Sequence, residues 1–230
     1  MALAAAGAAV ALVARRGERL TQLASSIEND GGRPLVITAD VAEPAQARDA
    51  VEQTVSVLGR IDTVVNNAGV MLLGPALEAP IEEWDRMLSV NLRGLLHVAH
   101  AALPHLVDGA ASSPRGVTDL VNISSVAGRV ARSGSAVYNM TKFGVVAFGE
   151  ALRQEMSPKH VRVSAIEPGV VATELSDHIR DGVREAVRER FSKIEPLTSE
   201  DIADAILYVV TRPRRVAVNE LLIRPTDQSF

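Results

Sequence analysis

Short apolar runs rich in Val, Leu and Ile recur along the chain, and longer amphipathic stretches separate them. Runs of this length, bounded by turn residues, are typical of buried strands. The pattern predicts six strands, at residues 8–14, 34–39, 62–67, 117–124, 161–167 and 216–223. It predicts helices at 17–29, 43–58, 80–106, 135–157 and 198–211, and a further charged helical stretch at about 175–193.

This alternation of strands and helices indicates one α/β domain over residues 1–230. We expect a Rossmann-like, doubly wound parallel sheet with helices on both faces. No linker, repeat or low-complexity tract divides the chain, and its length fits a single domain. The segment DGAASSPRG at 108–116 is small and polar, and is expected to form an exposed connection.

The apolar run ALAAAGAAVALVA at 2–14 has the length of a signal peptide. No positive segment precedes it, however, and it is too short to span a bilayer. We interpret it as the end of a helix, a turn at Gly7 and a buried strand.

Composition narrows the chemistry. Apolar residues make up 47% of the chain and aromatic residues 3%, so Ala, Val, Leu and Ile must build the core. The net charge of −4 argues against a nucleic-acid or anionic-membrane partner. The lack of Cys excludes disulfides, thiolate catalysis and Cys-ligated zinc, and is compatible with a cytoplasmic setting. The histidines have no carboxylates beside them in a metal-site pattern, so we expect no metal.

The strongest candidate for catalytic chemistry is the segment YNMTK at 138–142. On a helix, Tyr138 and Lys142 lie on one face. A phenol titrates near pH 10, and a nearby ammonium lowers its pKa, so the pair can serve as a general acid/base. The same spacing also arises by chance, as a surface lysine beside a half-buried tyrosine.

The surrounding sequence strengthens this candidate. Ser125 lies thirteen residues before Tyr138, at the carboxyl end of a predicted strand, where doubly wound sheets place their sites. Its hydroxyl can hydrogen-bond a substrate carbonyl, although a simple turn at the strand end is the alternative. Four further features follow strands or interrupt a helix: Asp40-Val41, Asn66-Asn67-Ala68-Gly69, Asn91 and Pro168-Gly169 with Thr173.

Together these motifs resemble the short-chain dehydrogenase/reductase family along nearly the whole chain. The resemblance implies that Tyr138 is the catalytic acid/base and that Ser125 orients and polarises the substrate carbonyl. It implies that Lys142 lowers the tyrosine pKa and binds the nicotinamide ribose, while Asn91 holds a water that links Lys142 to solvent. The implied contacts are with adenine for Asp40 and Val41, with the adenosine ribose for Asn67, Ala68 and Gly69, and with nicotinamide for Pro168, Gly169 and Thr173.

The residues after the first predicted strand bear on the cofactor. NAD-binding proteins of this fold usually carry an acidic residue at the end of their second strand, but here Ala14 is followed by Arg15 and Arg16. A guanidinium binds a 2′-phosphate, whereas a carboxylate repels it. We therefore expect NADP(H), with Arg15 on the phosphate and Arg16 stacked on adenine. Two ordinary surface arginines are the alternative.

One family feature is missing. No two glycines are two or four residues apart, so neither GxxxGxG nor GxGxxG is present. The amides of that loop hold the pyrophosphate, and the strand before it lies in the middle of the sheet. We expect that first central strand to be missing from the fold. Three explanations stay open: a start codon assigned too late, a real truncation, or a sheet that closes differently.

The leading hypothesis is an NADP(H)-dependent enzyme that interconverts a carbonyl and an alcohol on a small aldehyde, ketone or hydroxy acid. The main alternative is a catalytically inactive binding or interaction protein, and a nucleotide-sugar epimerase or reductase also shares YxxxK. The stretch 218–226 is similar to a subgroup that includes clavulanate-aldehyde reductases and 3-hydroxy acid dehydrogenases. That resemblance implies a homodimer or homotetramer. Residues 174–195 are expected to form a mobile lid.

Overall fold

Strands and helices alternate along the chain as the apolar pattern predicts. The computed structural model describes residues 1–229, apart from the side chain of residue 190. The strands are β1 (Ala9–Ala14), β2 (Arg33–Thr38), β3 (Thr63–Asn66), β4 (Thr118–Ile123), β5 (Val161–Pro168) and β6 (Glu220–Ile223). The α-helices are α1 (Ala2–Ala5), α2 (Gly17–Asn29), α3 (Pro44–Leu58), α4 (Ile81–Met87), α5 (Leu95–Ser112), α6 (Ala136–Met156), α7 (Asp181–Phe191) and α8 (Ser199–Val210). The remaining turns of helix are the π-helix η1 (Leu88–Gly94) and the 3₁₀ helices η2 (Val126–Gly128), η3 (Ser157–Lys159) and η4 (Glu174–His178).

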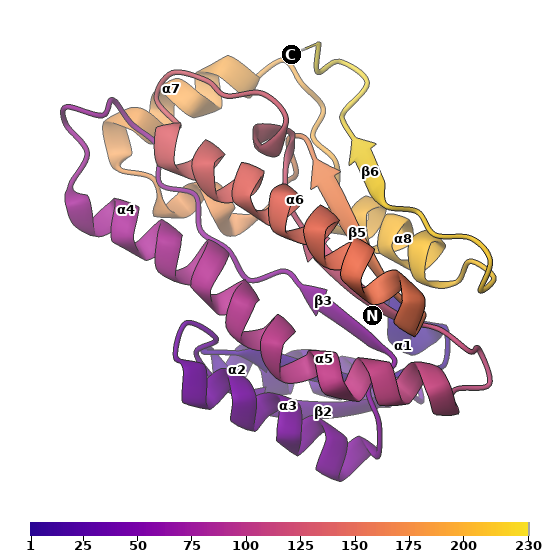
Figure 1. The fold of residues 1–230 in the computed structure, drawn as a ribbon. Helices are drawn as coiled ribbons and strands as arrows, with labels where there is room; N and C mark the ends of the chain where they lie inside the picture. Colours follow the sequence, from indigo (N-terminus) through magenta and orange to yellow (C-terminus); the bar gives the residue numbers. More distant parts are fainter. Residues whose placement is uncertain (230) are drawn as a thin grey trace.

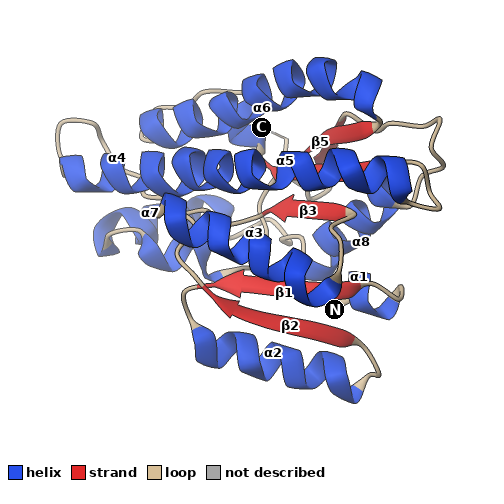
Figure 2. Cartoon of the chain, turned by 60° about the horizontal axis from the view of Figure 1, so that its bottom comes forward, coloured by secondary structure: helices blue, strands red, loops and turns tan. Residues whose placement is uncertain are grey.

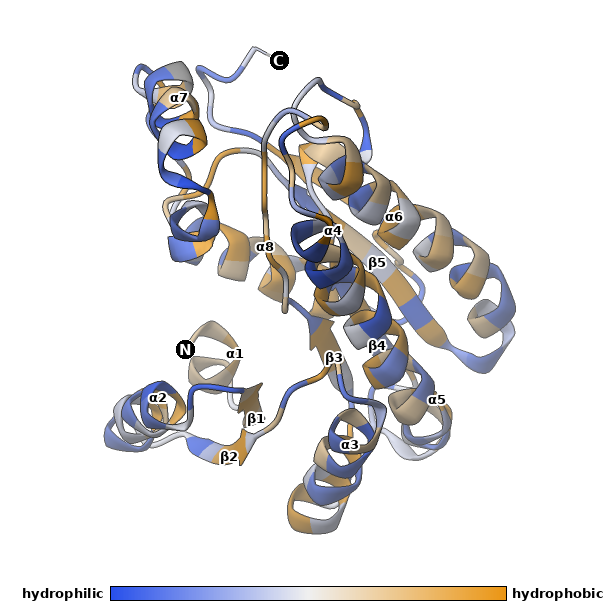
Figure 3. Cartoon of the chain, turned by 90° about the vertical axis from the view of Figure 1, so that its left-hand side faces the viewer, coloured by the Kyte–Doolittle hydropathy of each residue, from blue (hydrophilic) through white to orange (hydrophobic). Residues whose placement is uncertain are grey.

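The strands form two parallel sheets. One contains β1 and β2, and the other contains β3, β4, β5 and β6 in that order. Within residues 1–229 no ladder joins β1 to β3, and Figure 3 shows the β1–β2 pair lying apart from β3. The order is that of the expected doubly wound sheet, in which one strand position separates β1 from β3.

This division explains why β1 is not the buried strand that the sequence suggests. None of its residues is buried, and 36% of Val13 is exposed. The strand pairs with β2 within the described residues, so a second neighbour does not cover its other edge. The turn before it is as expected, because Gly7 adopts a φ of 91°, which L side chains rarely adopt.

Helices cover both faces of the larger sheet. Figure 1 shows α5 and α6 in front of the strands, and Figure 3 shows α8 on the opposite side from α4, α5 and α6. Neighbouring residues of β4 serve the two faces, because side chains alternate along a strand. Leu120 packs with Leu106 of α5, whereas Val121 packs with Val209 of α8. Both strand residues are fully buried, as expected for parallel strands between two helical layers.

The expectation of an exposed connection at 108–116 is wrong for the first half of this segment. Helix α5 continues to Ser112, and Gly109 and Ala110 are buried. A Cβ on Gly109 would lie 2.8 Å from the carbonyl oxygen of Ile61. The small residues therefore allow the helix to approach the backbone before β3, and do not mark a loop.

The last strand is shorter than expected and begins at Glu220 instead of residue 216. Backbone carbonyl groups of the residues before β6 accept hydrogen bonds from side chains of β5. Arg162 Nη1 donates to the Val216 oxygen at 2.7 Å, and Ser164 Oγ donates to the Val218 oxygen at 2.7 Å. No helix within the described residues is both long and apolar enough to cross a membrane.

Candidate active site

Tyr138 and Lys142 lie one turn apart near the start of α6, which packs across β5. Both side chains are buried, with 6% and 7% of their surfaces exposed. Lys142 Nζ lies 5.8 Å from the centre of the Tyr138 ring and donates a hydrogen bond to the Ile123 oxygen at 2.9 Å. Because Ile123 ends β4, the lysine joins α6 to the carboxyl end of the sheet.

Burial controls the titration of both groups. It raises the pKa of Tyr138 to about 12, and a hydrogen bond from Ser125 acts in the opposite direction. Burial also lowers the pKa of Lys142 to about 8. The expectation that the lysine lowers the tyrosine pKa is therefore not met in this structure, because desolvation of the phenolate outweighs the stabilising influences.

Ser125 lies between β4 and η2 at the same edge of the sheet. Its Oγ accepts a hydrogen bond from the Ala127 amide at 3.1 Å, which caps η2. It also lies 3.4 Å from the carbonyl oxygen of Pro168, to which it donates. The hydroxyl thus contacts both Tyr138 and the end of β5.

The close approach of η2 to α6 depends on a glycine. A Cβ on Gly128 would lie 2.6 Å from Ser124 Oγ and 2.9 Å from the carbonyl oxygen of Lys142. Ser124 Oγ itself donates to that Lys142 oxygen at 3.0 Å. These contacts fix the strand end that carries Ser125 against the helix that carries Tyr138.

Asn91 lies in the π-helix η1 and is 2% exposed. Its Oδ1 accepts from the Val70 amide at 2.7 Å, and its Nδ2 donates to the Val70 oxygen at 2.9 Å and to Thr141 Oγ1 at 3.1 Å. The side chain therefore ties the segment after β3 to α6, one residue from Lys142. A role in holding a water stays a prediction.

Asn139 is a structural member of the site that the sequence analysis missed. It is 3% exposed, and its Nδ2 donates to the Ala127 and Val130 oxygens at 2.7 and 3.0 Å. Its Oδ1 accepts from the Arg132 amide and from Ser135 Oγ at 3.1 and 2.6 Å. The available signal was a polar residue directly after Tyr138, in the first turns of a helix.

The predicted contacts of the adenosine end lie beyond β2 and β3. Asp40 Oδ1 accepts from the Ala42 amide at 3.0 Å, and Arg15 Nη1 lies 3.6 Å from Asp40 Oδ2. The Val41 oxygen lies 3.2 Å from His97 Nδ1. Asn67 and Ala68 are exposed, and Gly69 is half-buried.

Gly69 lies between the two halves of the site. A Cβ on Gly69 would be 3.4 Å from Asn91 Oδ1 and 3.9 Å from Lys142 Nζ. The backbone at Gly69 therefore lies close to the side chains of Asn91 and Lys142. This places one predicted ribose-binding residue next to one predicted catalytic residue.

Pro168 and Gly169 follow the same edge at the end of β5. A Cβ on Gly169 would lie 2.1 Å from Gln228 Oε1, and the same oxygen accepts from the Val170 amide at 3.0 Å. The C-terminal segment therefore packs directly on the loop predicted to contact nicotinamide. Thr173, further along this loop, caps η4 by accepting from the Leu175 amide.

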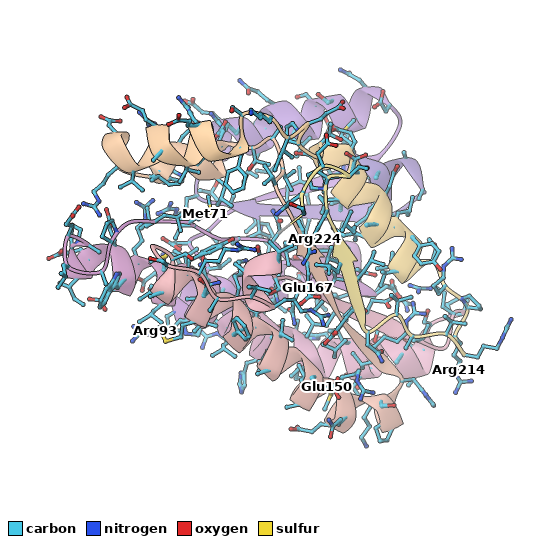
Figure 4. The ribbon with its side chains drawn as sticks, turned by 90° about the horizontal axis from the view of Figure 1, so that it is seen from above. Met71, Arg93, Glu150, Glu167, Arg214 and Arg224 are labelled. Carbon is cyan, nitrogen blue, oxygen red and sulfur yellow. The ribbon has the colours of Figure 1, made fainter. Side chains whose placement is uncertain are left out.

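A cluster of ion pairs lies beside the loop that follows β5. Glu167 is fully buried and accepts from Arg129 Nε at 2.8 Å and from Nη2 at 2.6 Å, and Arg129 also pairs with Glu220. Figure 4 shows Glu167 in the middle of the molecule, and the residue lies on β5, where it pairs with Leu222 of β6. The cluster joins η2, β5 and β6 next to Ser125 and Pro168.

The arginines after β1 pair with acidic side chains. Arg16 Nη1 donates to Glu174 Oε2 at 3.0 Å, and Arg19 Nη1 donates to Glu174 Oε1. Arg19 was missed, although it lies three residues after Arg16 on the same helical face. Figure 2 shows that β1 and β3 point to the same side of the molecule, where α7 also lies.

A shallow pocket lies beside Tyr138. Its lining includes Leu72, Trp84, Met87 and Val137. Leu72 and Met87 pack with Tyr138. Among the described residues, no group of three or more His, Asp or Glu side chains is arranged to hold a metal ion. The phenol of Tyr138, the ammonium of Lys142 and the hydroxyl of Ser125 lie near this pocket's edge of the sheet.

The strand order and the helices on both faces are those of the Rossmann-type class of α/β proteins, and Lys142 bonds the carboxyl end of β4, the edge where this class binds its ligands. Residues 1–184 match the family model for short chain dehydrogenases. The chain belongs to the short-chain dehydrogenase family.

Relatives of known sequence or structure extend over nearly the whole chain. It is 35% identical over 228 residues to an uncharacterized oxidoreductase of Staphylococcus saprophyticus, covering 97% of this chain and 88% of that protein. It is also 35% identical over 228 residues to sulfoacetaldehyde reductase 2 of Chromohalobacter salexigens, covering 98% and 87%. A serine dehydrogenase in a closed form with NADP+ superimposes with a TM-score of 0.85 at 33% identity, covering 98% and 88%.

Proposed function

We propose that this protein is an NADP(H)-dependent oxidoreductase that interconverts a carbonyl group and an alcohol. The observation that carries the proposal is the buried Tyr138–Lys142 pair, with the Ser125 hydroxyl hydrogen-bonded to the Tyr138 phenol. Proton donors of this kind, aimed from one edge of a sheet, suit a carbonyl oxygen that gains negative charge.

The residues present fit the two ends of the cofactor. The Lys142 ammonium beside the backbone of Gly69 suits the nicotinamide ribose hydroxyls, and the paired guanidinium groups of Arg16 and Arg19 already hold an anionic group. The serine dehydrogenase with a similar fold is complexed with NADP+. No residue of this sequence is assigned to the pyrophosphate, because the glycine-rich loop is missing from it.

Each side chain has a defined task in reduction. NADPH, when bound, would supply a hydride to the carbonyl carbon. Tyr138 Oη donates its proton to the carbonyl oxygen, and its raised pKa keeps the phenol protonated at neutral pH. The Ser125 hydroxyl donates a hydrogen bond to the same oxygen, and Lys142 holds the ribose and the helix in place. The reverse reaction returns the proton to Tyr138.

The substrate class is a small molecule with an aldehyde or alcohol beside a charged group. Support comes from relatives that are named as a sulfoacetaldehyde reductase and a serine dehydrogenase. The alternative of an inactive binding protein has less support, because the full Ser125, Tyr138 and Lys142 set is present and the named relatives are oxidoreductases.

The assembly proposed is a homodimer or homotetramer. Apolar side chains on the outer faces of α5 and α6 are 41–51% exposed, at Leu96, Met140 and Phe143. Adjacent exposed apolar groups of this kind are typical of contact surfaces between subunits. Light scattering coupled to gel filtration measures the mass, and a monomer of 24.5 kDa would contradict this part of the proposal.

The test of function compares two tyrosine variants. NADPH oxidation is followed with sulfoacetaldehyde and related aldehydes, and NADP+ reduction with serine. Tyr138→Phe removes the proton donor and should abolish turnover while leaving the fold intact. Tyr208→Phe, at an exposed position on α8, makes the same chemical change and should leave turnover unchanged. Equal activity of the two variants would contradict the proposed role of Tyr138.

A further inference from the structure

Three arginines lie within five residues after β1, and their charges are compensated unequally. Arg15 faces Asp40, whereas Arg16 and Arg19 converge on the single carboxylate of Glu174. The cluster therefore carries three positive and two negative charges. Since Arg16 precedes α2 and Arg19 lies in its first turn, the positive end of the helix dipole adds to this excess.

Glu174 reaches this site from a distant part of the chain. It lies 158 residues after Arg16 and 155 residues after Arg19, in η4 directly after Thr173. Each carboxylate oxygen accepts from a different guanidinium, so one anionic group fills the space between two cationic forks. The two arginines also hold the pKa of Glu174 below its ordinary value, with Arg19 the larger cause.

Arg15 is less suited to bind another anion. Its Nη1 lies 3.6 Å from Asp40, whose carboxylate also accepts from the Ala42 amide and stays fixed in the turn after β2. An anion that reached Arg15 would meet this fixed negative charge. The partner of Arg16 and Arg19, in contrast, belongs to the segment 174–195 that the sequence predicts to form a lid, and half of its side chain is exposed.

We propose that Arg16 and Arg19 form the site for the 2′-phosphate of the cofactor, and that Glu174 occupies this site until the phosphate displaces it. The inference rests on the proposed function and names the residues that bind the 2′-phosphate. It assigns a role to Arg19 and moves the phosphate contact from Arg15 to the Arg16–Arg19 pair.

The exchange is physically favourable for a phosphate. A phosphate monoester carries about −1.5 to −2 charges at neutral pH and presents three acceptor oxygens, which exceeds what one carboxylate offers to two forks. A ribose with a free 2′-hydroxyl carries no negative charge, so it cannot replace the carboxylate of Glu174 between the two guanidinium groups. The occupied site therefore yields to a 2′-phosphorylated ligand and not to its unphosphorylated counterpart.

The experiment measures binding by calorimetry with two small nucleotides. Adenosine 2′,5′-bisphosphate carries the 2′-phosphate, and adenosine 5′-monophosphate is the matched ligand without it. The variants are Glu174→Gln, Arg19→Met and Arg15→Met. Glu185→Gln, on α7 in the same segment 174–195, removes the same charge at an exposed position and serves as the control.

We expect Glu174→Gln to tighten bisphosphate binding by about 3- to 10-fold, with no change for the monophosphate. Arg19→Met should weaken bisphosphate binding by about 10-fold, more than Arg15→Met does. Glu185→Gln should match the wild type. Unchanged or weaker bisphosphate binding by Glu174→Gln would overturn the inference, as would a tightening that Glu185→Gln or the monophosphate shares.

The proposed function is judged separately, by turnover of the wild-type protein with NADPH. A wild-type protein that turns over NADPH but binds the bisphosphate no better than the monophosphate overturns this inference and leaves the proposed function intact. A wild-type protein that binds neither nucleotide and shows no turnover overturns both.

Discussion

Lys142 Nζ lies 5.8 Å from the centre of the Tyr138 ring, in a part of α6 where neither side chain reaches bulk water. Its one hydrogen bond to a protein group among the described residues is to the carbonyl oxygen of Ile123. A buried ammonium with so little compensation is destabilising. The position of Lys142 is thus explained by the chemistry of the site and not by the stability of the fold.

Lys142→Met should therefore stabilise the protein at pH 7. The change from a pKa of about 8 in the folded protein to 10.5 in the unfolded chain corresponds to about 3 kcal/mol of destabilisation. Loss of the bond to Ile123 offsets about 1 kcal/mol, so we expect a net gain of about 2 kcal/mol in the free energy of unfolding. Urea unfolding measures this gain, and turnover should be lost in the same variant.

The gain should depend on pH in one direction. Below pH 8 both states of the wild-type protein keep the lysine protonated, so the full penalty is present. Between pH 8 and 10.5 the unfolded chain binds the extra proton, so the wild-type protein becomes more stable as pH rises. The difference between the variant and the wild type should shrink over this interval. A difference that is constant or that grows would contradict the assigned pKa.

Asn91→Ala should destabilise the protein strongly. The change leaves the amide and carbonyl of Val70 and the hydroxyl of Thr141 without their partner in a buried environment. We expect a loss of about 3 kcal/mol or more. Asn67→Ala, at an exposed position on the adjoining loop, should cost no more than about 0.5 kcal/mol. Similar midpoints of urea unfolding for the two variants would argue against the bonding described for Asn91.

Gly128→Ala should impair both stability and turnover. The new Cβ would meet Ser124 Oγ at 2.6 Å and the Lys142 carbonyl oxygen at 2.9 Å, and the latter is backbone that cannot rotate away. We expect a loss of about 1–3 kcal/mol and a lower rate, because η2 and Ser125 must shift. Gly182→Ala on α7 has no atom within 4 Å of its new Cβ and should be neutral or slightly stabilising. Thermal unfolding and turnover of this pair separate crowding from the general effect of the substitution.

Arg129→Met should remove the partner of a fully buried carboxylate. Glu167 would be left in the interior without its guanidinium, at a cost of about 3–5 kcal/mol. The matched variant is Arg153→Met, whose partner Glu150 lies at the rim of the molecule in Figure 4 and is 45% exposed. That surface pair should contribute about 1 kcal/mol at most. Comparable losses in urea unfolding would contradict the assigned burial of Glu167.

The sequence predicted most of the fold because its apolar runs report burial directly. β4 and β5 were found within one residue at each end, since parallel strands covered on both faces keep every side chain apolar or bonded. The π-helix inside the stretch 80–106 could not be predicted. It occurs at Asn91, whose side chain bonds Val70 and Thr141, and no local sequence pattern reports such long-range bonds.

The candidate site shows the same division between local and long-range information. The relation between Tyr138 and Lys142 follows from a helical spacing, so the sequence predicted their shared face. The engagement of Arg16 by Glu174 spans 158 residues and could not be read from spacing. The raised pKa of Tyr138 was also not predicted, because burial, which the sequence did not reveal at that position, outweighs the hydrogen bond from Ser125.

The division of the sheet has a consequence for how the molecule opens. Strands β4 and β5 each have neighbours on both sides, whereas β1 and β2 share one ladder whose partners lie 24 residues apart, as in Ala9 and Arg33. Such a unit closes on local contacts and exposes much of its backbone, which places it at the low end of local unfolding free energies. The pair of β1 and β2 is therefore expected to open more readily than the larger sheet, and ligands that bind the arginines after β1 should stabilise this part of the molecule.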